Sequence, residues 1–376
     1  MIYLDNAATT YPKPEVVYRA LDLANREYGF NSGRGGYKKA KEVSNIIDET
    51  RNRLAKIVDA DAENVIFTTS STEALNIILF GIEWNKGDNI YVSLFEHNSV
   101  MRPLYEIQRR YEINIFQIPF DYNTWNVDYA KFNDMMTLNR PKGVICSSKS
   151  NVTGYNLPVH EIFELSKKFN SINLLDASQS FGVDKSISKQ NVDYIVFAGH
   201  KSLYASFGVA GFINVNNNFL NPLIFGGTGS DSLNLEMPKT GTSHLEAGSK
   251  NIIAIYGLHE SIQWLTNNDV EKKEKELFKY LLCKIKELPK VKVYIPDDVE
   301  CCSGILSFNV EGYTAEEVGD ILNEEYDICV RTGYHCCPYV HDFIGSRPFN
   351  GTVRISVNFF NTNDDIDVLI NALHTL

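Results

Sequence analysis

Apolar runs of strand length recur through the first two thirds of the chain, and helical patterns separate some of them. The runs lie at 64–70, 89–97, 113–120, 143–151, 172–180, 194–201 and 209–215, with helical patterns at 71–84 and 159–170. Nearly continuous apolar strands that alternate with helices are typical of a parallel sheet covered on both faces. We therefore predict an α/β fold with a seven-stranded, mostly parallel sheet.

The pattern changes after about residue 255. An amphipathic helical pattern at 270–288 is followed by apolar runs and helical patterns at 304–310, 315–326, 328–333, 352–360 and 365–376. This order predicts a smaller α+β domain. We expect a large domain at 13–255 and a small domain formed by 1–12 and 256–376. The segment 225–251 is too long for a simple connector, so we expect it to be functional or part of an interface.

Composition excludes several classes of protein. The 376 residues carry 36 basic and 47 acidic side chains, a net charge of −11. An acidic surface argues against nucleic acid and anionic membranes as partners. No apolar run approaches the roughly 18 residues of a membrane helix. The start of the sequence has neither a basic segment nor a long apolar one, so we expect a cytoplasmic protein without a signal peptide.

The cysteines do not suggest a disulfide framework or a metal site. They are Cys146, Cys283, Cys301, Cys302, Cys329, Cys336 and Cys337. An odd number in a long chain argues against a set of disulfides. Zinc sites use spaced pairs, whereas the pairs in this chain are adjacent in sequence. We expect no metal.

Polar residues follow several predicted strands, at the edge where open α/β sheets bind ligands. After the first strand, Ser70, Ser71 and Thr72 precede a helical pattern. Such residues form an anion site with the helix N-terminus, or they simply cap the helix. The sequence leaves both interpretations open.

Three further strand ends carry groups with two interpretations each. His97 is either structural or catalytic, and Asp176 is either an ion-pair partner or the acceptor for a protonated ring nitrogen. Lys201 follows a buried run, where an amine must be paired or used covalently. A phosphate site, a histidine, an aspartate and a lysine together are what pyridoxal 5′-phosphate (PLP) requires.

The sequence resembles the class V aminotransferase group of fold-type I PLP enzymes, and within it the cysteine desulfurases. The resemblance runs nearly end to end. It is carried, in the family's order, by "YLDNAATTYPKP", "NSGRGGYKKA", "FTTSSTEALN", "EHNS", "SNVTG", "DASQS", "GHKSLY", "GGTGS", "LEAGSKN", "RTGYHCCP" and "GTVRISVNFFNT". One such motif would be weak support, but this many in order is specific.

The resemblance implies a role for each matching residue around the cofactor. Lys201 would bind PLP as a Schiff base, and Asp176 would pair with the pyridine nitrogen. Gln179 would hydrogen-bond the phenolic oxygen, while His97 would stack on the ring and shuttle protons. Phosphate ligands would be Ser71, Thr72 and His200, with Thr228 reaching across from a partner subunit.

The resemblance also assigns the substrate side of the site. Arg354 would clamp the substrate carboxylate, Asn151 would lie near cofactor and substrate, and Cys336 matches the catalytic cysteine. Arg331 and His335 are candidates to lower the pKa of its thiol. Cys337 is either a small buried side chain or a relay for sulfur. The short segment between Cys336 and Arg354 predicts a compact loop.

The implied reaction converts L-cysteine to L-alanine and leaves a persulfide on Cys336. The persulfide then passes to a small thiol or a sulfur-carrier protein, and the enzyme is expected to be a homodimer. Selenocysteine lyase, with L-selenocysteine as substrate, would use the same residues. An aminotransferase or another PLP lyase on the same scaffold is the third interpretation.

Overall fold

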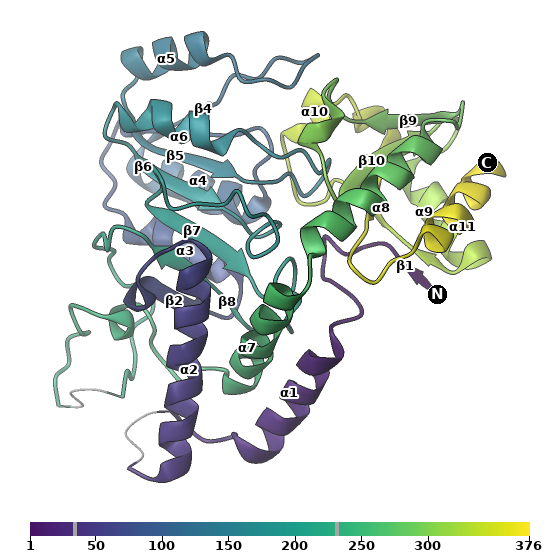
Figure 1. Cartoon of the computed structure of the whole chain (residues 1–376). Helices are drawn as coiled ribbons and strands as arrows, with labels where there is room; N and C mark the ends of the chain where they lie inside the picture. The colour runs from purple at the N-terminus through teal and green to yellow at the C-terminus, as the bar shows by residue number, and fades with distance from the viewer. Residues whose placement is uncertain (33–35, 230–232) are drawn as a thin grey trace.

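The structure is a computed structural model that describes residues 1–32, 36–229 and 233–376 (Figure 1). Two of the predicted motifs are therefore only partly described. Residues 33–35 of "NSGRGGYKKA" and residue 230 of "GGTGS" lie outside the described ranges.

A seven-stranded sheet forms the larger part of the molecule, as predicted. Its strands are β2 (Val65–Thr68), β3 (Asn89–Val92), β4 (Asn114–Gln117), β5 (Pro141–Ser147), β6 (Ile172–Asp176), β7 (Tyr194–Ala198) and β8 (Ala210–Asn214). The order across the sheet is β2-β8-β7-β6-β5-β3-β4. Strand β8 runs opposite to the other six strands, so the sheet is mostly parallel.

Helices cover both faces of this sheet. Along β3, Ile90 and Val92 belong to one apolar cluster and Tyr91 to the other, because successive side chains of a strand point to opposite faces. The first cluster takes in α3 (Ser71–Gly81) and α4 (Asn98–Tyr111). The second takes in α5 (Tyr129–Leu138) and α6 (Val159–Lys167). The helices α1 (Glu15–Glu27), α2 (Lys38–Ile57) and α7 (Ile252–Asn267) complete this part.

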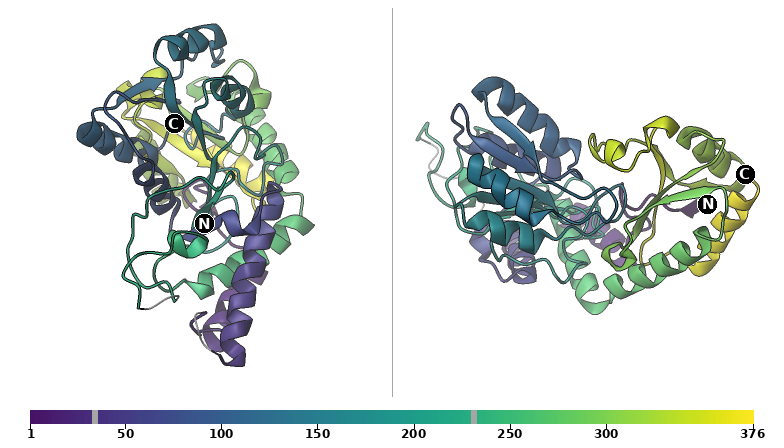
Figure 2. Two further views of the ribbon diagram at one scale, coloured as in Figure 1. Left: turned by 90° about the vertical axis from the view of Figure 1, so that its left-hand side faces the viewer. Right: turned by 90° about the horizontal axis from the view of Figure 1, so that it is seen from above.

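The C-terminal part contains a second, antiparallel sheet in the order β12-β13-β10-β9. These strands are β9 (Val291–Tyr294), β10 (Ile305–Val310), β12 (Arg331–Gly333) and β13 (Thr352–Ser356). The helices of this part are α8 (Val270–Ile285), α9 (Ala315–Tyr326), α10 (Val340–Phe343) and α11 (Asn363–His374). The right-hand view of Figure 2 shows this green and yellow part beside the blue and teal part.

The N-terminal segment pairs with the C-terminal part. Strand β1 (Ile2–Tyr3) pairs in parallel with β11 (Ile328–Cys329). The exact boundaries at 12 and 255 stay a prediction. Across the described ranges, no helix is both long and apolar enough to cross a membrane.

The predicted strands extend too far at their carboxyl ends. The run at 89–97 is a strand only to Val92, because the Ser93 hydroxyl then accepts the N–H of Phe95 at 3.1 Å and turns the chain. Leu94 and Phe95 are buried in that turn. The apolar pattern therefore continues beyond the end of the strand, because residues of the following turn are buried too. The candidate site residues lie at the strand ends or in the segments that follow them.

Candidate active site

A cavity of about 200 Å³ lies at the carboxyl ends of the parallel strands. It is lined by eight of the predicted residues: Ser71, Thr72, His97, Asn151, Asp176, Gln179, His200 and Lys201. They lie at the carboxyl end of β6 or in the segments that directly follow β2, β3, β5, β6 and β7. The structure thus brings together side chains that are up to 130 residues apart in the sequence.

The N-terminus of α3 forms one wall of the cavity. Ser70 is the N-cap, and its hydroxyl accepts the N–H of Glu73 at 3.2 Å. Ser71 and Thr72 are the first two residues of the helix and line the cavity. The capping interpretation is therefore confirmed for Ser70, while the anion site at Ser71 and Thr72 stays a prediction. Ser70 caps the helix, while the next two residues stand where the helix dipole favours an anion.

His97 forms the N-cap of α4 through its ring. Its Nδ1 accepts the N–H of Ser99 at 3.0 Å, so the proton of the neutral ring is on Nε2. Burial, and to a smaller extent the nearby charge of Lys201, lower the pKa of His97 to about 4. The ring is therefore a neutral imidazole at physiological pH, with a fixed tautomer.

Asp176 and Lys201 are two of the ionisable side chains that line the cavity. Asp176 Oδ1 accepts from the Ser178 N–H at 3.0 Å and hydroxyl at 2.5 Å, and no described lysine or arginine forms an ion pair with this carboxylate. The ion-pair interpretation of Asp176 is thus not supported. Burial lowers the pKa of Lys201 to about 8, although Asp176 acts in the opposite direction. A substantial fraction of this amine is therefore neutral near physiological pH, as a nucleophile or base requires.

The donor set fits PLP. His200 Nδ1 is buried without a partner among the described side chains and backbone, and the ring stacks on Phe207 with 4.4 Å between centroids. Burial lowers the pKa of His200 to about 3, so the ring stays neutral. The helix N-terminus and His200 suit a phosphate, the Lys201 amine suits an aldehyde and Asp176 suits a pyridinium nitrogen. The Gln179 amide donates to the Ala7 carbonyl at 3.0 Å.

The two adjacent cysteines have opposite environments. The Cys336 side chain is exposed, whereas Cys337 is only 1% exposed. Cys337 donates its S–H to the Glu96 carbonyl at 3.3 Å, and burial raises the pKa of this thiol well above its ordinary value. The Cys336 carbonyl accepts the N–H of Asn98 at 2.7 Å. The loop is thus fastened on both sides of His97, with Cys337 packed inside and Cys336 accessible.

A chain of contacts connects this loop to Arg354. The Asn151 amide donates to the His335 carbonyl at 2.9 Å, and Arg354 Nη1 donates to the Asn151 carbonyl at 2.9 Å. Arg354 Nη2 lies 2.5 Å from Asp5 Oδ1, while its buried Nε has no partner in the described chain. Arg354 is 2% exposed and does not line the cavity, so a bidentate clamp on a substrate requires it to exchange one of these contacts.

His335 does not provide positive charge to the thiol. Burial holds the pKa of His335 well below its ordinary value, and its Nε2 lies 2.9 Å from Thr352 Oγ1. The ring is therefore neutral. Of the two residues expected to assist Cys336 electrostatically, only Arg331 carries charge.

Thr228 lies outside the cavity lining. It belongs to the long segment 225–251, whose apolar side chains Phe225, Leu233 and Leu235 are 73%, 96% and 100% exposed. The predicted contribution of Thr228 to a partner's phosphate site stays a prediction.

Glu96 is a buried carboxyl that the sequence reasoning did not use. Its Oε1 accepts from the Ser93 hydroxyl at 2.5 Å and the Ser147 N–H at 2.7 Å, and Oε2 accepts from the Ser147 hydroxyl at 2.9 Å. It therefore ties the ends of β3 and β5 beneath His97. Burial raises the pKa of Glu96 to about 7. Its position inside an apolar run was the available signal, because a carboxylate there needs partners.

Further cavity residues were also missed. They are Ser99, Ser147, Lys149 and Ser178. Ser147 is the last residue of β5, and each of the other three lies within two positions of a predicted residue. Small hydroxyl residues have many structural uses, so the sequence contained no signal that separated the three serines from others. Lys149 is a buried lysine just after an apolar run, which was an available signal because such an amine needs a partner or a function.

The sequence matches the family described as aminotransferase class V over residues 2–369. The chain belongs to this family. Its curated relatives include a probable cysteine desulfurase from Methanothermobacter thermautotrophicus, 29% identical over 388 residues, which cover 100% of this chain and 94% of the relative. The cysteine desulfurase of Wigglesworthia glossinidia brevipalpis is also 29% identical, over 99% of this chain and 92% of the relative.

Solved structures show the same architecture. The apo cysteine desulfurase from Thermococcus onnurineus NA1 superposes with a TM-score of 0.92 at 26% identity, over 100% of this chain and 94% of that one. The cysteine desulfurase CsdA from Escherichia coli has a TM-score of 0.86 at 23% identity, over 99% and 94%. The second likeness supports the fold alone.

Proposed function

We propose that the chain is a PLP-dependent cysteine desulfurase that converts L-cysteine to L-alanine and leaves the sulfur as a persulfide on Cys336. One observation carries the proposal. An accessible thiol lies on a loop that is hydrogen-bonded to the Asn98 N–H, next to a histidine of the cavity that also contains the buried Lys201 amine. Transamination alone does not need such a nucleophile.

The cavity residues have separate tasks in this reaction. When bound, PLP supplies an aldehyde that condenses with amines and a ring that withdraws electrons. Ser71, Thr72 and His200 hold the phosphate, and Asp176 holds the ring nitrogen in its protonated form. Lys201, whose pKa burial lowers to about 8, removes the Cα proton of the substrate and returns it.

The remaining residues act on the substrate. Arg354 binds the carboxylate in place of one of its present contacts, and Asn151 links Arg354 to the loop of Cys336. His97 covers the ring and donates from Nε2, because Nδ1 is held by Ser99. The Cys336 thiolate attacks the substrate sulfur, so that an S–S bond forms and the Cβ–S bond breaks. The electron pair of the broken bond stays with the substrate carbon, which takes up a proton, and alanine is released.

Product analysis tests the proposal. The purified protein with PLP receives L-cysteine and dithiothreitol, and alanine and sulfide are measured together. We expect equal amounts, and no alanine from Cys336→Ala. If alanine is absent while an amino group passes to a keto acid, the protein is an aminotransferase. If L-selenocysteine gives alanine in Cys336→Ala but L-cysteine gives none even in the unmodified protein, it is a selenocysteine lyase.

We also propose a homodimer, in which the exposed Phe225, Leu233 and Leu235 become covered and Thr228 reaches the partner's phosphate site. Side chains of this size and exposure are typical of an interface. Equilibrium sedimentation tests this directly. The predicted cytoplasmic location stays a prediction.

A further inference from the structure

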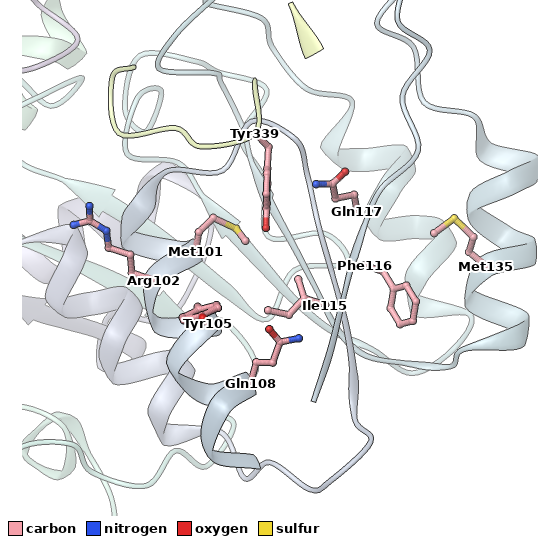
Figure 3. A pocket seen from close by; sticks show the side chains of 9 residues that line it. All are labelled: Met101, Arg102, Tyr105, Gln108, Ile115, Phe116, Gln117, Met135 and Tyr339. Carbon is pink, nitrogen blue, oxygen red and sulfur yellow. The ribbon is translucent and has the colours of Figure 1, made fainter. Parts of the chain in front are cut away.

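A groove of about 680 Å³ lies at the edge of the large sheet, outside the cavity that contains Lys201 (Figure 3). Four lining residues come from α4, three from β4 and one each from α5 and the segment after Cys336. They are Met101, Arg102, Tyr105, Gln108, Ile115, Phe116, Gln117, Met135 and Tyr339. Tyr339 points into the groove between Met101 and Gln117 in Figure 3. Most of this lining is apolar or neutral.

The open edge of β4 lies along this groove. Strand β4 is the last strand of the sheet, and no described strand pairs with its outer side. The Asn114 N–H donates to the carbonyl of Asp88, the residue before β3, at 2.8 Å. The Ile118 N–H donates to the carbonyl of Val92, the last residue of β3, at 2.9 Å. Because alternate residues of a parallel strand turn their N–H and C=O groups the other way, Ile115 and Gln117 present theirs outward. These groups can pair with an added extended strand.

The groove begins beside the loop that contains Cys336. Asn98, whose N–H binds the Cys336 carbonyl, is one helical turn before Met101 and Arg102 on α4. Tyr339 follows Cys336 by three residues and lines the groove. Strand β4 runs toward the edge of the sheet that contains the site, so its Gln117 end is the nearer one. A chain lying along β4 would thus arrive next to Cys336.

The charge of the groove differs from that of the molecule. Arg102 is exposed and forms no ion pair with a described residue, although the chain as a whole has a net charge of −11. It is the one lysine, arginine, aspartate or glutamate among the lining residues. An occupant with a carboxylate near the Cys336 end is therefore favoured at this place.

We propose that this groove binds an extended, thiol-bearing segment of the sulfur acceptor, which adds to β4 as a further strand. The proposal rests on the proposed desulfurase function. Apolar side chains of the segment pack on Ile115 and Met101, its main chain pairs with Gln117, and an acidic residue near its thiol faces Arg102. The thiol itself reaches Cys336.

The transfer step is balanced without any further reactant. The acceptor thiolate attacks the outer sulfur of the Cys336 persulfide, and a new S–S bond forms on the acceptor. The S–S bond at Cys336 breaks, and Cys336 leaves as a thiolate. One persulfide is lost and one is formed, so no net oxidation occurs.

Synthetic peptides test the groove. The probe is acetyl-Val-Thr-Val-Thr-Glu-Gly-Cys-amide, together with a version that has its cysteine first, because either strand direction is compatible with the edge. For each of the two probes, a counterpart with Gly and Ser in place of Val and Thr has the same thiol and carboxylate but little strand propensity. Discharge of the Cys336 persulfide is followed by rapid quenching at equal thiol concentrations. We expect one of the Val-Thr peptides to act at least about tenfold faster than its Gly-Ser counterpart.

Gln117→Pro is the matched test of strand addition, with Gln117→Thr as its control. Proline removes the outward N–H and is tolerated on edge strands, whereas threonine keeps the N–H. Gln117→Pro should lower the peptide rate to that of the Gly-Ser peptide, and Gln117→Thr should not. Arg102→Glu should slow the peptide several-fold. All three variants should discharge to dithiothreitol at the unmodified rate, which also shows that they are folded.

The outcomes separate the two proposals. If dithiothreitol releases no sulfide from the unmodified protein, the desulfurase function fails, and the groove proposal with it. If dithiothreitol releases sulfide but neither Val-Thr peptide exceeds its Gly-Ser counterpart, only the groove proposal is overturned. Equal peptide rates in Gln117→Pro and Gln117→Thr overturn it as well. Should Gln117→Pro fail to fold, the peptide comparison and Arg102→Glu still decide.

Discussion

Replacing Glu96 with glutamine should reduce the pH dependence of stability. Glu96 is fully buried and ties Ser93 to Ser147 beneath the active site. Burial raises the pKa of its carboxyl from an ordinary 4.5 to about 7, against the effect of its hydrogen bonds. Glutamine keeps the shape, and its oxygen still accepts from the Ser147 N–H. Its amide donates to the Ser147 hydroxyl, which can also accept.

The size of the effect follows from linkage. A carboxyl with a raised pKa in the folded state contributes stability below the unfolded pKa and loses it as the pH rises through the folded pKa. For a shift from 4.5 to about 7 the full contribution is about 3 kcal/mol, and about 2 kcal/mol of it disappears between about pH 5.5 and 7.5. In Glu96→Gln this loss should be absent.

Urea unfolding at the two pH values measures the effect. In the unmodified protein, the ionisation of Glu96 should lower the free energy of unfolding by about 2 kcal/mol between pH 5.5 and 7.5. In Glu96→Gln this contribution should be missing, so the free energy of unfolding should change by about 2 kcal/mol less in that direction. The exposed Glu325→Gln controls for the loss of one formal charge. If Glu96→Gln and Glu325→Gln give the same pH dependence, Glu96 is ionised throughout this range and the reasoning from burial is wrong.

Three further substitutions have expected outcomes. Cys337→Ala should still release alanine and should lose about 1 kcal/mol of stability, because a buried sulfur atom and its S–H bond to the Glu96 carbonyl are removed. Loss of alanine release would instead support a sulfur relay. Ser70→Ala should cost about 1 kcal/mol in urea unfolding through loss of the α3 cap, and an unchanged midpoint would contradict that cap. Arg354→Lys should raise the KM for L-cysteine far more than it lowers kcat, since an ammonium cannot replace a planar fork that already contacts Asp5; a change in kcat alone would contradict the substrate role.

The sequence predicted the large sheet well because its buried strands are strongly patterned. All seven apolar runs contain a strand, including the run at 113–120, which contains β4. The reversed direction of β8 could not be predicted, since an apolar run has no direction. The strand ends could not be placed either, because Leu94 and Phe95 are as buried in a turn as they would be in a strand.

The sequence predicted which residues form the site better than it predicted the contacts between them. Motif order brought out the residues of the cavity, and the structure then separated Cys336 from Cys337 by exposure. Contacts such as Arg354 with Asp5 join residues 349 positions apart, and no local pattern reports them. The open edge of β4 likewise depends on the strand order of the whole sheet.

The most direct test of the account is the location of the sulfur. The protein is loaded with PLP, given one portion of L-cysteine without reductant, alkylated and digested, and the peptide that contains both adjacent cysteines is analysed by fragmentation mass spectrometry. The account predicts one additional sulfur atom on Cys336 in step with alanine formation, and none on Cys337. Additional sulfur on Cys337, or alanine formed at the full rate in Cys336→Ser, would contradict it.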